Sequence, residues 1–396
     1  MSSFILKNVK LVTRNEILAD QAVLVGGGRI RSIVPADQNS LSIPPGLAVF
    51  DGEGRYLAPG FIDLHIHGAM NHLADQGPDA LEALSQALLP FGVTGFLAGL
   101  TPQKGSENEE EQLKAFAGRT YNGSAVLGFF LEGHYLALSG AISNIPRDYS
   151  PELVRRRIDA LQPYPAIFGI SPETPGICDL LPLMTQYGVP AFITHTRATA
   201  DQTEQAIRAG ATHATHFFDV FPYIGDQEGG VRGCGTVEAI LAGDQTTVDF
   251  ILDGEHVNPI ALRVALKALG PDRVSLCTDA NLNAGLPPGT YTSLGDQEIT
   301  VAYPGAPARL GPNTHSPGGL CGSGLTLDRA VRNAISMLDL PLPQAVAMAS
   351  TNPARVLGLG CRKGRVAPGF DADLVLLDEQ LTVAAAWVGG CLLYQR

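Results

Sequence analysis

Between residues 61 and 279 the sequence alternates short apolar segments typical of strands with amphipathic segments typical of helices. Strands separated by helices pair in parallel, because each helix returns the chain to the same end of the next strand. The pattern therefore predicts an α/β fold, a TIM-like (β/α)8 barrel. The strands are expected at residues 61–67, 95–100, 125–132, 166–170, 191–195, a short segment ending at 216, 247–252 and 274–279.

Helices are expected between and after these strands, at residues 78–91, 152–161, 259–269, 325–338 and 344–349. The charged run at 107–111 is expected to start a solvent-exposed helix. Residues 290–315 are rich in proline and glycine and lack a helical period. This segment is therefore expected to form a β-hairpin insertion or a lid.

Both ends of the chain carry short strand patterns without a helical period, at residues 4–50 and 373–394. Two β-rich ends around a long middle predict one small β-sandwich that both termini build, with the barrel inserted between them. The expected domains are residues 1–56 and 359–396 for the sandwich and residues 57–358 for the barrel.

The composition and net charge of the chain limit the kinds of partner it is expected to bind. The chain has 396 residues and a formal net charge of −12, which argues against nucleic acid or an anionic membrane surface as a partner. No apolar run is long enough to span a bilayer, and the first sixteen residues lack the apolar core of a signal peptide. Six scattered cysteines without a C-x-x-C pair indicate free thiols in a reducing compartment. A cytoplasmic protein is expected.

Several of the expected strands end in residues that commonly bind metals. His65 and His67 lie two apart on the first strand, so their imidazoles point to the same face near its C-terminal end. Active sites of (β/α)8 barrels lie at the C-terminal ends of the strands. Further residues of this kind at such positions are Glu132, His195, His216 and Asp279.

Each of these residues also has an ordinary structural interpretation. A histidine at a strand end is more often a hydrogen-bonded core residue than a ligand, and an aspartate there is commonly a helix cap. Taken as a set on one rim of one barrel, they favour a metal site. Imidazole nitrogens and carboxylate oxygens suit zinc or another divalent first-row metal, with iron, manganese and cobalt as alternatives and one or two ions bound.

The chain resembles the amidohydrolase superfamily and, within it, the N-acetylglucosamine-6-phosphate deacetylases. The resemblance rests on motifs spread over essentially the whole length. They are Pro-Gly-Phe-Ile-Asp-Leu-His-Ile-His-Gly at 59–68, Leu-Glu-Gly at 131–133, His195, Ala-Thr-His at 214–216, Asp-Gly-Glu-His-Val at 253–257, Thr-Asp-Ala at 278–280, and the segments 322–326, 352–355 and 363–374.

The resemblance implies roles for particular residues. Glu132, His195 and His216 would hold the main catalytic metal, and His65 with His67 would complete a second metal position. Asp279 would be the general acid/base that takes a proton from an attacking metal-bound water and passes it to the departing amine. His256 would contact the sugar, and the protein would be a homodimer.

Three residues depart from the family pattern where a phosphate or substrate contact is expected. Asp219 replaces an asparagine, Gln227 replaces an arginine and Ile142 replaces a histidine. The first two changes weaken anion binding, by repulsion and by loss of a bidentate donor. Residues that could compensate are His134, Arg197 and Arg232, although a surface ion pair is the ordinary interpretation of the two arginines.

The function implied by the resemblance is hydrolysis of the acetyl amide of an N-acetyl amino sugar, with N-acetylglucosamine-6-phosphate as the leading substrate. One alternative keeps the same machinery on a non-phosphorylated or different N-acyl substrate. Another is a non-catalytic homologue that only binds a ligand or scaffolds a complex, and the complete ligand set together with Asp279 argues against it.

Overall fold

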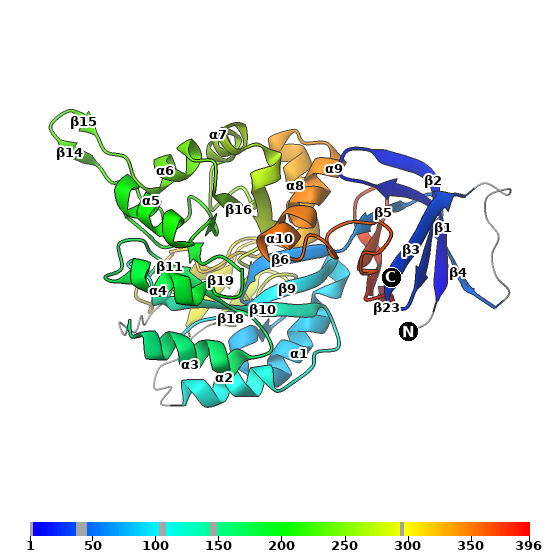
Figure 1. The fold of residues 1–396 in the computed structure, drawn as a ribbon, viewed down its shortest axis with the longest axis horizontal. Helices are drawn as coiled ribbons and strands as arrows, with labels where there is room; N and C mark the ends of the chain where they lie inside the picture. The colour runs from blue at the N-terminus through cyan, green and yellow to red at the C-terminus, as the bar shows by residue number, and fades with distance from the viewer. Residues whose placement is uncertain (1–2, 37–45, 103–107, 143–148, 294–296) are drawn as a thin grey trace.

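Eight parallel strands form a nearly closed barrel in the middle of the chain (Figure 1). The structure, a computed structural model, describes residues 3–36, 46–102, 108–142, 149–293 and 297–396. The barrel strands follow one another in chain order, each hydrogen-bonded to the next. They are β6 (Phe61–Ile66), β9 (Val93–Leu100), β10 (Ala125–Tyr135), β11 (Ala166–Ile170), β12 (Phe192–Ile193), β13 (His213–Ala214), β16 (Thr247–Ile251) and β17 (Val274–Cys277).

The first and last strands meet only at their C-terminal ends. The backbone N–H of Asp279 donates to the carbonyl of His65 at 2.8 Å, and the N–H of His67 donates to the carbonyl of Ala280 at 3.0 Å. The seam of the barrel is therefore closed next to the residues expected to bind metal.

Helices surround the barrel and pack apolar side chains against its strands. The helix expected at 78–91 ends earlier, because Pro90 and Gly92, which has φ of 76°, turn the chain through a short 3-10 segment at Leu89–Phe91. The α-helices are α1 (Pro78–Ala87), α2 (Glu109–Ala117), α3 (Pro151–Leu161), α4 (Ile177–Met184), α5 (Ala200–Ala209), α6 (Thr236–Ala242), α7 (Pro259–Leu269), α8 (Leu327–Leu338), α9 (Leu342–Ala349) and α10 (Thr351–Val356).

Strands from both ends of the chain form one mixed sheet beside the barrel, as Figure 1 shows in blue and red. Its strand order is β23-β22-β21-β5-β1-β2-β3, with β4 paired to β1. Trp387 packs with Phe4 and Phe50 in its core, at ring-centroid distances of 6.1 and 5.9 Å. The strands are β1 (Phe4–Val12), β2 (Ile17–Gly26), β3 (Arg29–Pro35), β4 (Ala48–Asp51), β5 (Tyr56–Pro59), β21 (Leu374–Leu377), β22 (Val383–Val388) and β23 (Cys391–Gln395).

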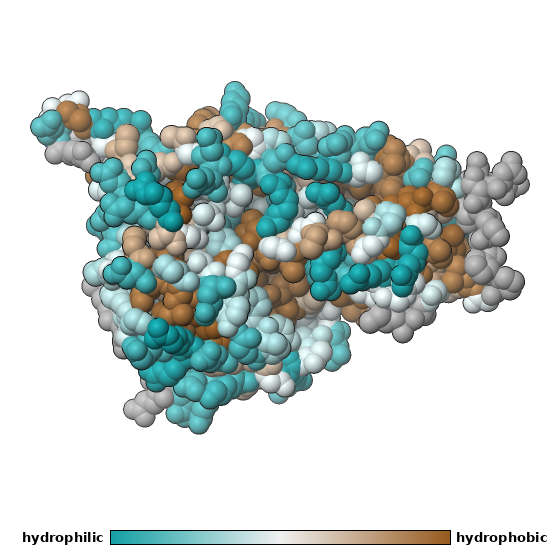
Figure 2. All heavy atoms as spheres, in the orientation of Figure 1, coloured by the Kyte–Doolittle hydropathy of each residue, from teal (hydrophilic) through white to brown (hydrophobic). Residues whose placement is uncertain are grey.

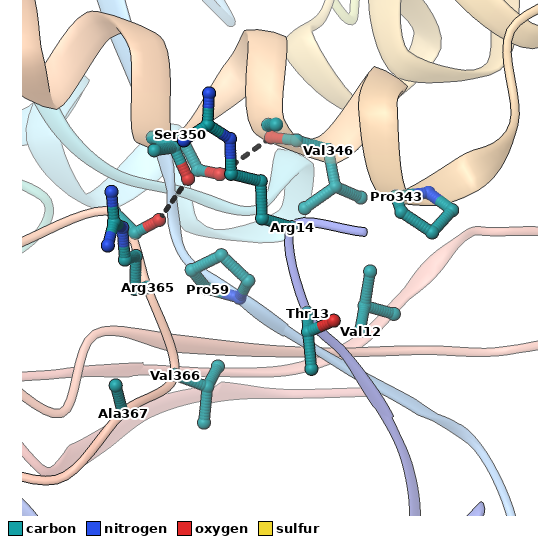
Figure 3. A pocket seen from close by; sticks show the side chains of 13 residues that line it. Val12, Thr13, Arg14, Pro59, Pro343, Val346, Ser350, Arg365, Val366 and Ala367 are labelled. Atoms are coloured by element: carbon teal, nitrogen blue, oxygen red, sulfur yellow. Dashed lines mark hydrogen bonds between the residues drawn. The ribbon is translucent and has the colours of Figure 1, made fainter. Parts of the chain in front are cut away.

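The terminal sheet meets the barrel at the end opposite the expected ligands. A pocket of about 170 Å³ lies at this junction, lined by residues of β1, of the β5–β6 junction, of α9 and of the segment 364–367 (Figure 3). Pro59, which precedes β6, lies in its wall. The expected fold, a barrel with a small β unit made by both termini, is confirmed. The domain boundaries at 56/57 and 358/359 remain a prediction.

Three smaller sheets are present besides the barrel and the terminal sheet. The described part of the segment 290–315 forms an antiparallel sheet of β18 (Gly289–Thr292), β19 (Glu298–Val301) and β20 (Arg309–Leu310). Arg309 of this insertion forms an ion pair with Glu255 at 3.2 Å. The hairpin of β14 (Asp226–Glu228) and β15 (Val231–Arg232) extends away from the body as an arm, and β7 (Gly68–Ala69) pairs with β8 (His72–Leu73).

The face of the molecule shown in Figure 2 has both polar and apolar regions. Hydrophilic residues cover much of the face shown in Figure 2, and apolar residues gather over the terminal sheet, where Ile17, Val49 and Leu393 are exposed. Within the described residues, no helix combines the length and the apolar character needed to cross a membrane.

Candidate metal-binding active site

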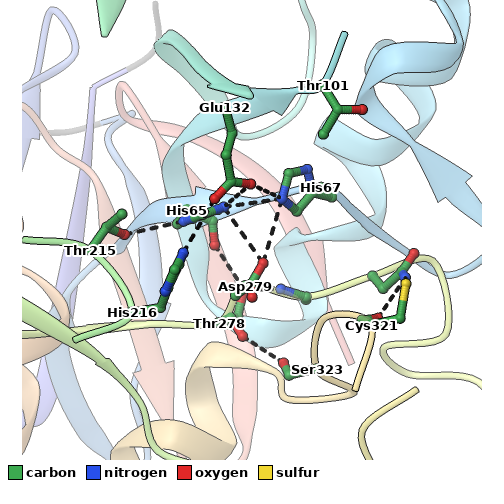
Figure 4. Close-up of polar contacts among 12 residues, drawn as sticks. His65, His67, Thr101, Glu132, Thr215, His216, Thr278, Asp279, Cys321 and Ser323 are labelled. Atoms are coloured by element: carbon green, nitrogen blue, oxygen red, sulfur yellow. Dashed lines mark hydrogen bonds and ion pairs between the residues drawn. The ribbon is translucent and has the colours of Figure 1, made fainter. Parts of the chain in front are cut away.

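Six candidate residues converge at the C-terminal ends of the barrel strands, and all are at most 9% exposed. Figure 4 labels all of them except His195. The strands position them because each residue lies on a strand or within two residues of its end. The six are His65, His67, Glu132, His195, His216 and Asp279. These side chains therefore form one compact, buried cluster of imidazoles and carboxylates at the rim of the barrel.

Glu132 lies at the centre of this group and bridges its two halves. Its Oε2 atom lies 3.3 Å from Nε2 of His65 and 3.1 Å from Nε2 of His67. Its Oε1 atom lies 3.3 Å from Nε2 of His195 and 3.2 Å from Nε2 of His216. One carboxylate therefore offers one oxygen to each histidine pair.

The arrangement forms two triads that could each hold a metal ion. One consists of His65, His67 and Glu132, and the other of Glu132, His195 and His216, with the ligand atoms of each triad within 4.8 Å of one another. Two imidazoles and a carboxylate are a donor set that divalent first-row metals favour. Two ions sharing a bridging carboxylate would fit the same geometry.

The far sides of the imidazoles support this interpretation. Nδ1 of His65 lies 3.1 Å from the Thr215 hydroxyl, and Nδ1 of His195 lies 3.0 Å from the carbonyl of Leu138. Nδ1 of His216 lies 3.3 Å from the carbonyl of Asp219. An Nδ1–H that donates outward leaves the Nε2 lone pair for a metal, which is how ligand histidines are usually held. The donor set therefore fits a divalent metal.

The backbone at three of these residues is unusual. His195, His216 and Asp279 have φ of 50°, 35° and 44°, in the left-handed region that non-glycine residues rarely adopt. Each is the second residue after its strand, and the residue between it and the strand is a buried threonine. The expected strand at 191–195 is accordingly shorter, because the backbone leaves the extended conformation to aim the imidazole inward. Conformations of this kind cluster at functional sites.

Two glycines leave room for the imidazoles. A Cβ atom on Gly99 would lie 2.8 Å from Nδ1 of His67. A Cβ atom on Gly140 would lie 2.5 Å from Cε1 of His195, and Gly140 has φ of 54°. Any side chain at either position would push a ligand histidine away from the cluster.

The charges of the cluster favour protonated imidazoles when no metal is bound. Burial lowers the pKa of His67 and of His216, but the hydrogen bond and charge of Glu132 outweigh it and raise these pKa values to about 9 and about 10. Burial raises the pKa of Glu132, but the surrounding histidines hold it well below its usual range. Protons and a metal therefore compete for the same Nε2 atoms.

Asp279 faces both histidines of the first triad. Its Oδ1 atom lies 3.5 Å from Nε2 of His65 and 3.5 Å from Nε2 of His67. The preceding Thr278 is held by Asp63, which accepts its hydroxyl at 2.7 Å and its backbone N–H at 3.1 Å. Burial raises the pKa of Asp63 to about 7. The buried contact between Asp63 and Thr278 therefore helps to place Asp279 beside the candidate metal positions.

His256 and Asp219 lie near the same space. Nδ1 of His256 forms an ion pair with Asp253 at 2.6 Å. Burial lowers the pKa of His256, but Asp253 raises it, with smaller contributions in the same direction from the charges of Asp219 and Asp279. His256 is therefore within electrostatic reach of both Asp219 and Asp279.

The remaining candidate substrate contacts make no described contact with the six clustered side chains. Arg197 is exposed, and Arg232, on the arm, pairs with Glu238 at 2.7 Å. The side chain of Gln227 lies outside the described residues. The backbone N–H of Ile142 donates to the carbonyl of Ser139 at 2.9 Å.

His134 points away from the metal ligands. Its Nε2 atom lies 2.7 Å from Glu109 of α2, which also accepts hydrogen bonds from Nε and Nη2 of Arg157 of α3, one on each carboxylate oxygen. Burial raises the pKa of Glu109, but His134 and Arg157 outweigh it and lower this pKa to about 2. The first turn of α2, expected to be solvated, therefore contributes a carboxylate that joins β10, α2 and α3.

Glu109→Gln should lower the free energy of unfolding at neutral pH by roughly 2 kcal/mol, because an amide cannot replace the ion pair with Arg157. The folded pKa of about 2 lies below the usual 4.5, so this stability is present above pH 4.5 and is lost as the pH falls toward 2. Urea unfolding midpoints of wild type and variant should approach each other as the pH falls from about 4.5 toward about 2. A gap that stays constant over this range would contradict the ion pair.

Comparison with known proteins identifies the family. Residues 56–392 match the amidohydrolase family. The chain belongs to this family. The amidohydrolase is 30% identical over 394 residues to the N-acetylgalactosamine-6-phosphate deacetylase of Escherichia coli O157:H7, with 98% of each sequence covered. It is 31% identical over 392 residues to the N-acetylglucosamine-6-phosphate deacetylase of Lysinibacillus sphaericus, covering 96% of this chain and 95% of the relative.

Solved structures agree over the full length. A mutant N-acetyl-D-glucosamine-6-phosphate deacetylase from Mycobacterium smegmatis, in complex with N-acetyl-D-glucosamine-6-phosphate, matches with a TM-score of 0.85, 30% identity and complete coverage of both chains. The N-acetylglucosamine-6-phosphate deacetylase of Pasteurella multocida matches with a TM-score of 0.86 and 25% identity, covering 98% of this chain and 99% of the other. This amidohydrolase is therefore a hydrolase of the deacetylase type that acts on an amide carbon–nitrogen bond.

Proposed function

We propose that this amidohydrolase removes the acetyl group from an N-acetyl amino sugar, with N-acetylglucosamine-6-phosphate as the leading substrate. The observation that carries the proposal is Asp279, whose carboxylate lies 3.5 Å from two candidate ligands in a buried cluster organised by Glu132. The homologue structure with bound N-acetyl-D-glucosamine-6-phosphate supports the substrate class. Water and the amide are consumed, and acetate and a free amine are produced.

In the proposed mechanism Asp279 moves the proton. It takes a proton from the attacking water and returns it to the nitrogen of the departing amine, a role that a carboxylate can fill within hydrogen-bond reach of both atoms. A divalent metal held by Glu132 and the four histidines, with zinc as our first choice, would polarise the acetyl carbonyl and lower the pKa of a water to about 7. Burial of the cluster excludes other water, which strengthens each charge interaction.

His256 is proposed to orient the sugar. Asp253 holds its Nδ1 atom at 2.6 Å, so the imidazole is fixed and its Nε2 atom remains to donate to a sugar oxygen. The charge of Asp219 acts on His256, and the carbonyl of Asp219 lies 3.3 Å from Nδ1 of His216. These two residues therefore bear most directly on which substrate fits.

A second substrate candidate is a sugar without phosphate, or another N-acyl compound. The observation that favours it is charge: Asp219 lies beside His216, with its carbonyl 3.3 Å from Nδ1 of that residue, and the guanidinium of Arg232 is engaged by Glu238. A phosphate bound near Asp219 would be repelled by its carboxylate, whereas a neutral side chain at this position would not repel it. For the two sugars, the candidates differ in whether phosphate contributes to binding.

Asp219→Asn should separate these candidates. Removing one like charge near a phosphate should raise kcat/KM for N-acetylglucosamine-6-phosphate by roughly tenfold and leave N-acetylglucosamine unchanged. Asp201→Asn, an exposed carboxylate on α5, is the matched control and should change neither value. Equal kcat/KM of the wild type on the two sugars would favour the non-phosphorylated candidate. An unchanged preference in Asp219→Asn would place the phosphate elsewhere.

We also propose that the protein is a homodimer. The arm formed by β14 and β15 extends from the body and exposes Val231 at its tip, and the nearby Tyr223 is 57% exposed. Exposed apolar side chains on a projecting hairpin support an interface with a second copy. Sedimentation analysis of the wild type and of Val231→Asp tests this, with a dimer that the substitution weakens as the expected result.

A further inference from the structure

Beneath the metal ligands lies a fully buried polar network centred on Asp249 of β16, which has no exposed surface. Its Oδ1 atom accepts the backbone N–H of His216 at 2.6 Å. Both of its oxygens lie 3.1 Å from the Thr215 hydroxyl. Its Oδ2 atom lies 3.0 Å from Nε2 of His213. A carboxylate buried this deeply is stable only because each of these donors points at it.

Counting protons along the network fixes their positions. A threonine hydroxyl has one proton, and a carboxylate accepts but does not donate, so the proton of Thr215 points to Asp249. The lone pair of that hydroxyl then faces Nδ1 of His65 at 3.1 Å, as the dashed line in Figure 4 shows. Nδ1 of His65 must therefore carry a hydrogen, and the lone pair of this imidazole is left on Nε2, inside the cluster.

His213 completes the support from the other side. Its Nδ1 atom lies 2.8 Å from the Thr247 hydroxyl, which satisfies the second nitrogen of the ring. With Nε2 donating to Asp249, the imidazole ties β13 to β16 directly below the ligands. Neither His213 nor Asp249 lies within reach of the substrate space by any described contact, so their effect has to pass through Thr215 and His216.

We propose that Asp249 is a positioning residue that organises one ligand of each metal triad. Through Thr215 it sets the tautomer of His65 so that Nε2 can bind a metal, and through the backbone N–H it holds His216 in its left-handed conformation. This inference rests on the metal-dependent function proposed above.

Thr215→Val and Thr215→Ser test the relay as a matched pair, because valine removes the hydroxyl at nearly the same volume and serine keeps it. Zn²⁺ affinity and stoichiometry are measured by competition with a chromophoric chelator, and coordination by the visible spectrum of the Co²⁺ protein. Thr215→Val should weaken binding at the His65 triad by about 10- to 100-fold. Thr215→Ser should bind within about twofold of wild type and keep its Co²⁺ spectrum.

Asp249→Asn provides the independent variant. If its amide nitrogen donates to Thr215, the hydroxyl must turn its proton to Nδ1 of His65, which moves the hydrogen of that ring to Nε2 and blocks the metal. The predicted loss is therefore larger than for Thr215→Ser and affects His216 as well. Circular dichroism and melting of the metal-free proteins confirm folding, and Asp249→Asn decides the question if Thr215→Val does not fold.

The outcomes separate this inference from the function on which it rests. A wild type that binds no Zn²⁺ would overturn the metal-dependent function itself. A wild type that binds Zn²⁺ with the same affinity and Co²⁺ spectrum as Thr215→Val and Asp249→Asn would overturn only the relay. Weakened binding in both, with Thr215→Ser restoring the wild-type values, is the result we expect.

Discussion

Asp279→Asn should reduce kcat for deacetylation by about 10²- to 10⁴-fold while leaving the metal content unchanged. The asparagine keeps the size of the side chain and its support from Thr278, but its amide cannot accept a proton from water and return it to nitrogen. Because Asp279 is proposed to act in the transition state, kcat and kcat/KM should fall together. Steady-state release of acetate, with metal quantified in the same preparation, measures both effects.

A matched control separates this effect from general damage. Asp272→Asn removes a carboxylate at the opposite end of the barrel, where Asp272 pairs with Arg14, and should leave kcat unchanged. Full activity in Asp279→Asn would show that another group moves the proton, and His67 and His256 would be the next candidates. Loss of metal together with activity would instead make Asp279 a ligand.

Glu132→Gln is expected to disable both metal positions with one substitution. The glutamine loses the negative charge that faces four imidazoles, and it offers only one oxygen where two now serve the two histidine pairs. Since a catalytic metal supplies several kcal/mol of charge stabilisation, kcat/KM should fall by about 10³-fold or more. Metal per chain after dialysis against a chelator should fall toward zero.

Glu132→Asp is the companion variant because it keeps the charge and shortens the reach. It should retain metal better than Glu132→Gln, which would show that the charge, and not only the shape, holds the site together. A Glu132→Gln protein with wild-type metal content and activity would contradict the bridging role that the geometry assigns to Glu132.

The main features of the fold could be predicted from local patterns. Apolar runs followed by helical segments indicate a parallel barrel, and strand patterns at both termini indicate the additional sheet. The ligand positions follow from the same reasoning, because residues at the C-terminal ends of barrel strands meet at one rim. The lengths of β12 and β13 could not be predicted, since His195 and His216 leave the strand in left-handed conformations.

The direction of His134 shows where periodicity fails. Two residues after Glu132, it is expected on the same face of the strand. Gly133 has φ of 131°, and the pairing of β10 with β11 shifts register between Leu131 and Tyr135, so the alternation is interrupted. His134 therefore turns to Glu109. The sequence does not distinguish a regular strand from one bent at a glycine.

The threonine and aspartate side chains that hold the candidate ligands in place were not predicted from the sequence. Thr194, Thr215 and Thr278 each precede a candidate residue directly, so a repeated threonine was visible in the sequence. Its meaning depends on contacts between distant strands, such as that between Thr215 and Asp249, which only the closed barrel brings together.

The most direct test of the proposed function is the quantity of acetate and free amine formed from N-acetylglucosamine-6-phosphate and N-acetylglucosamine by zinc-reconstituted and by chelator-treated protein. The account predicts equal amounts of acetate and amine from at least one of the two sugars, only with the reconstituted protein, and recovery when zinc is restored. No release from either sugar or from a broad panel of N-acyl compounds by fully reconstituted protein would contradict it and favour a non-catalytic homologue.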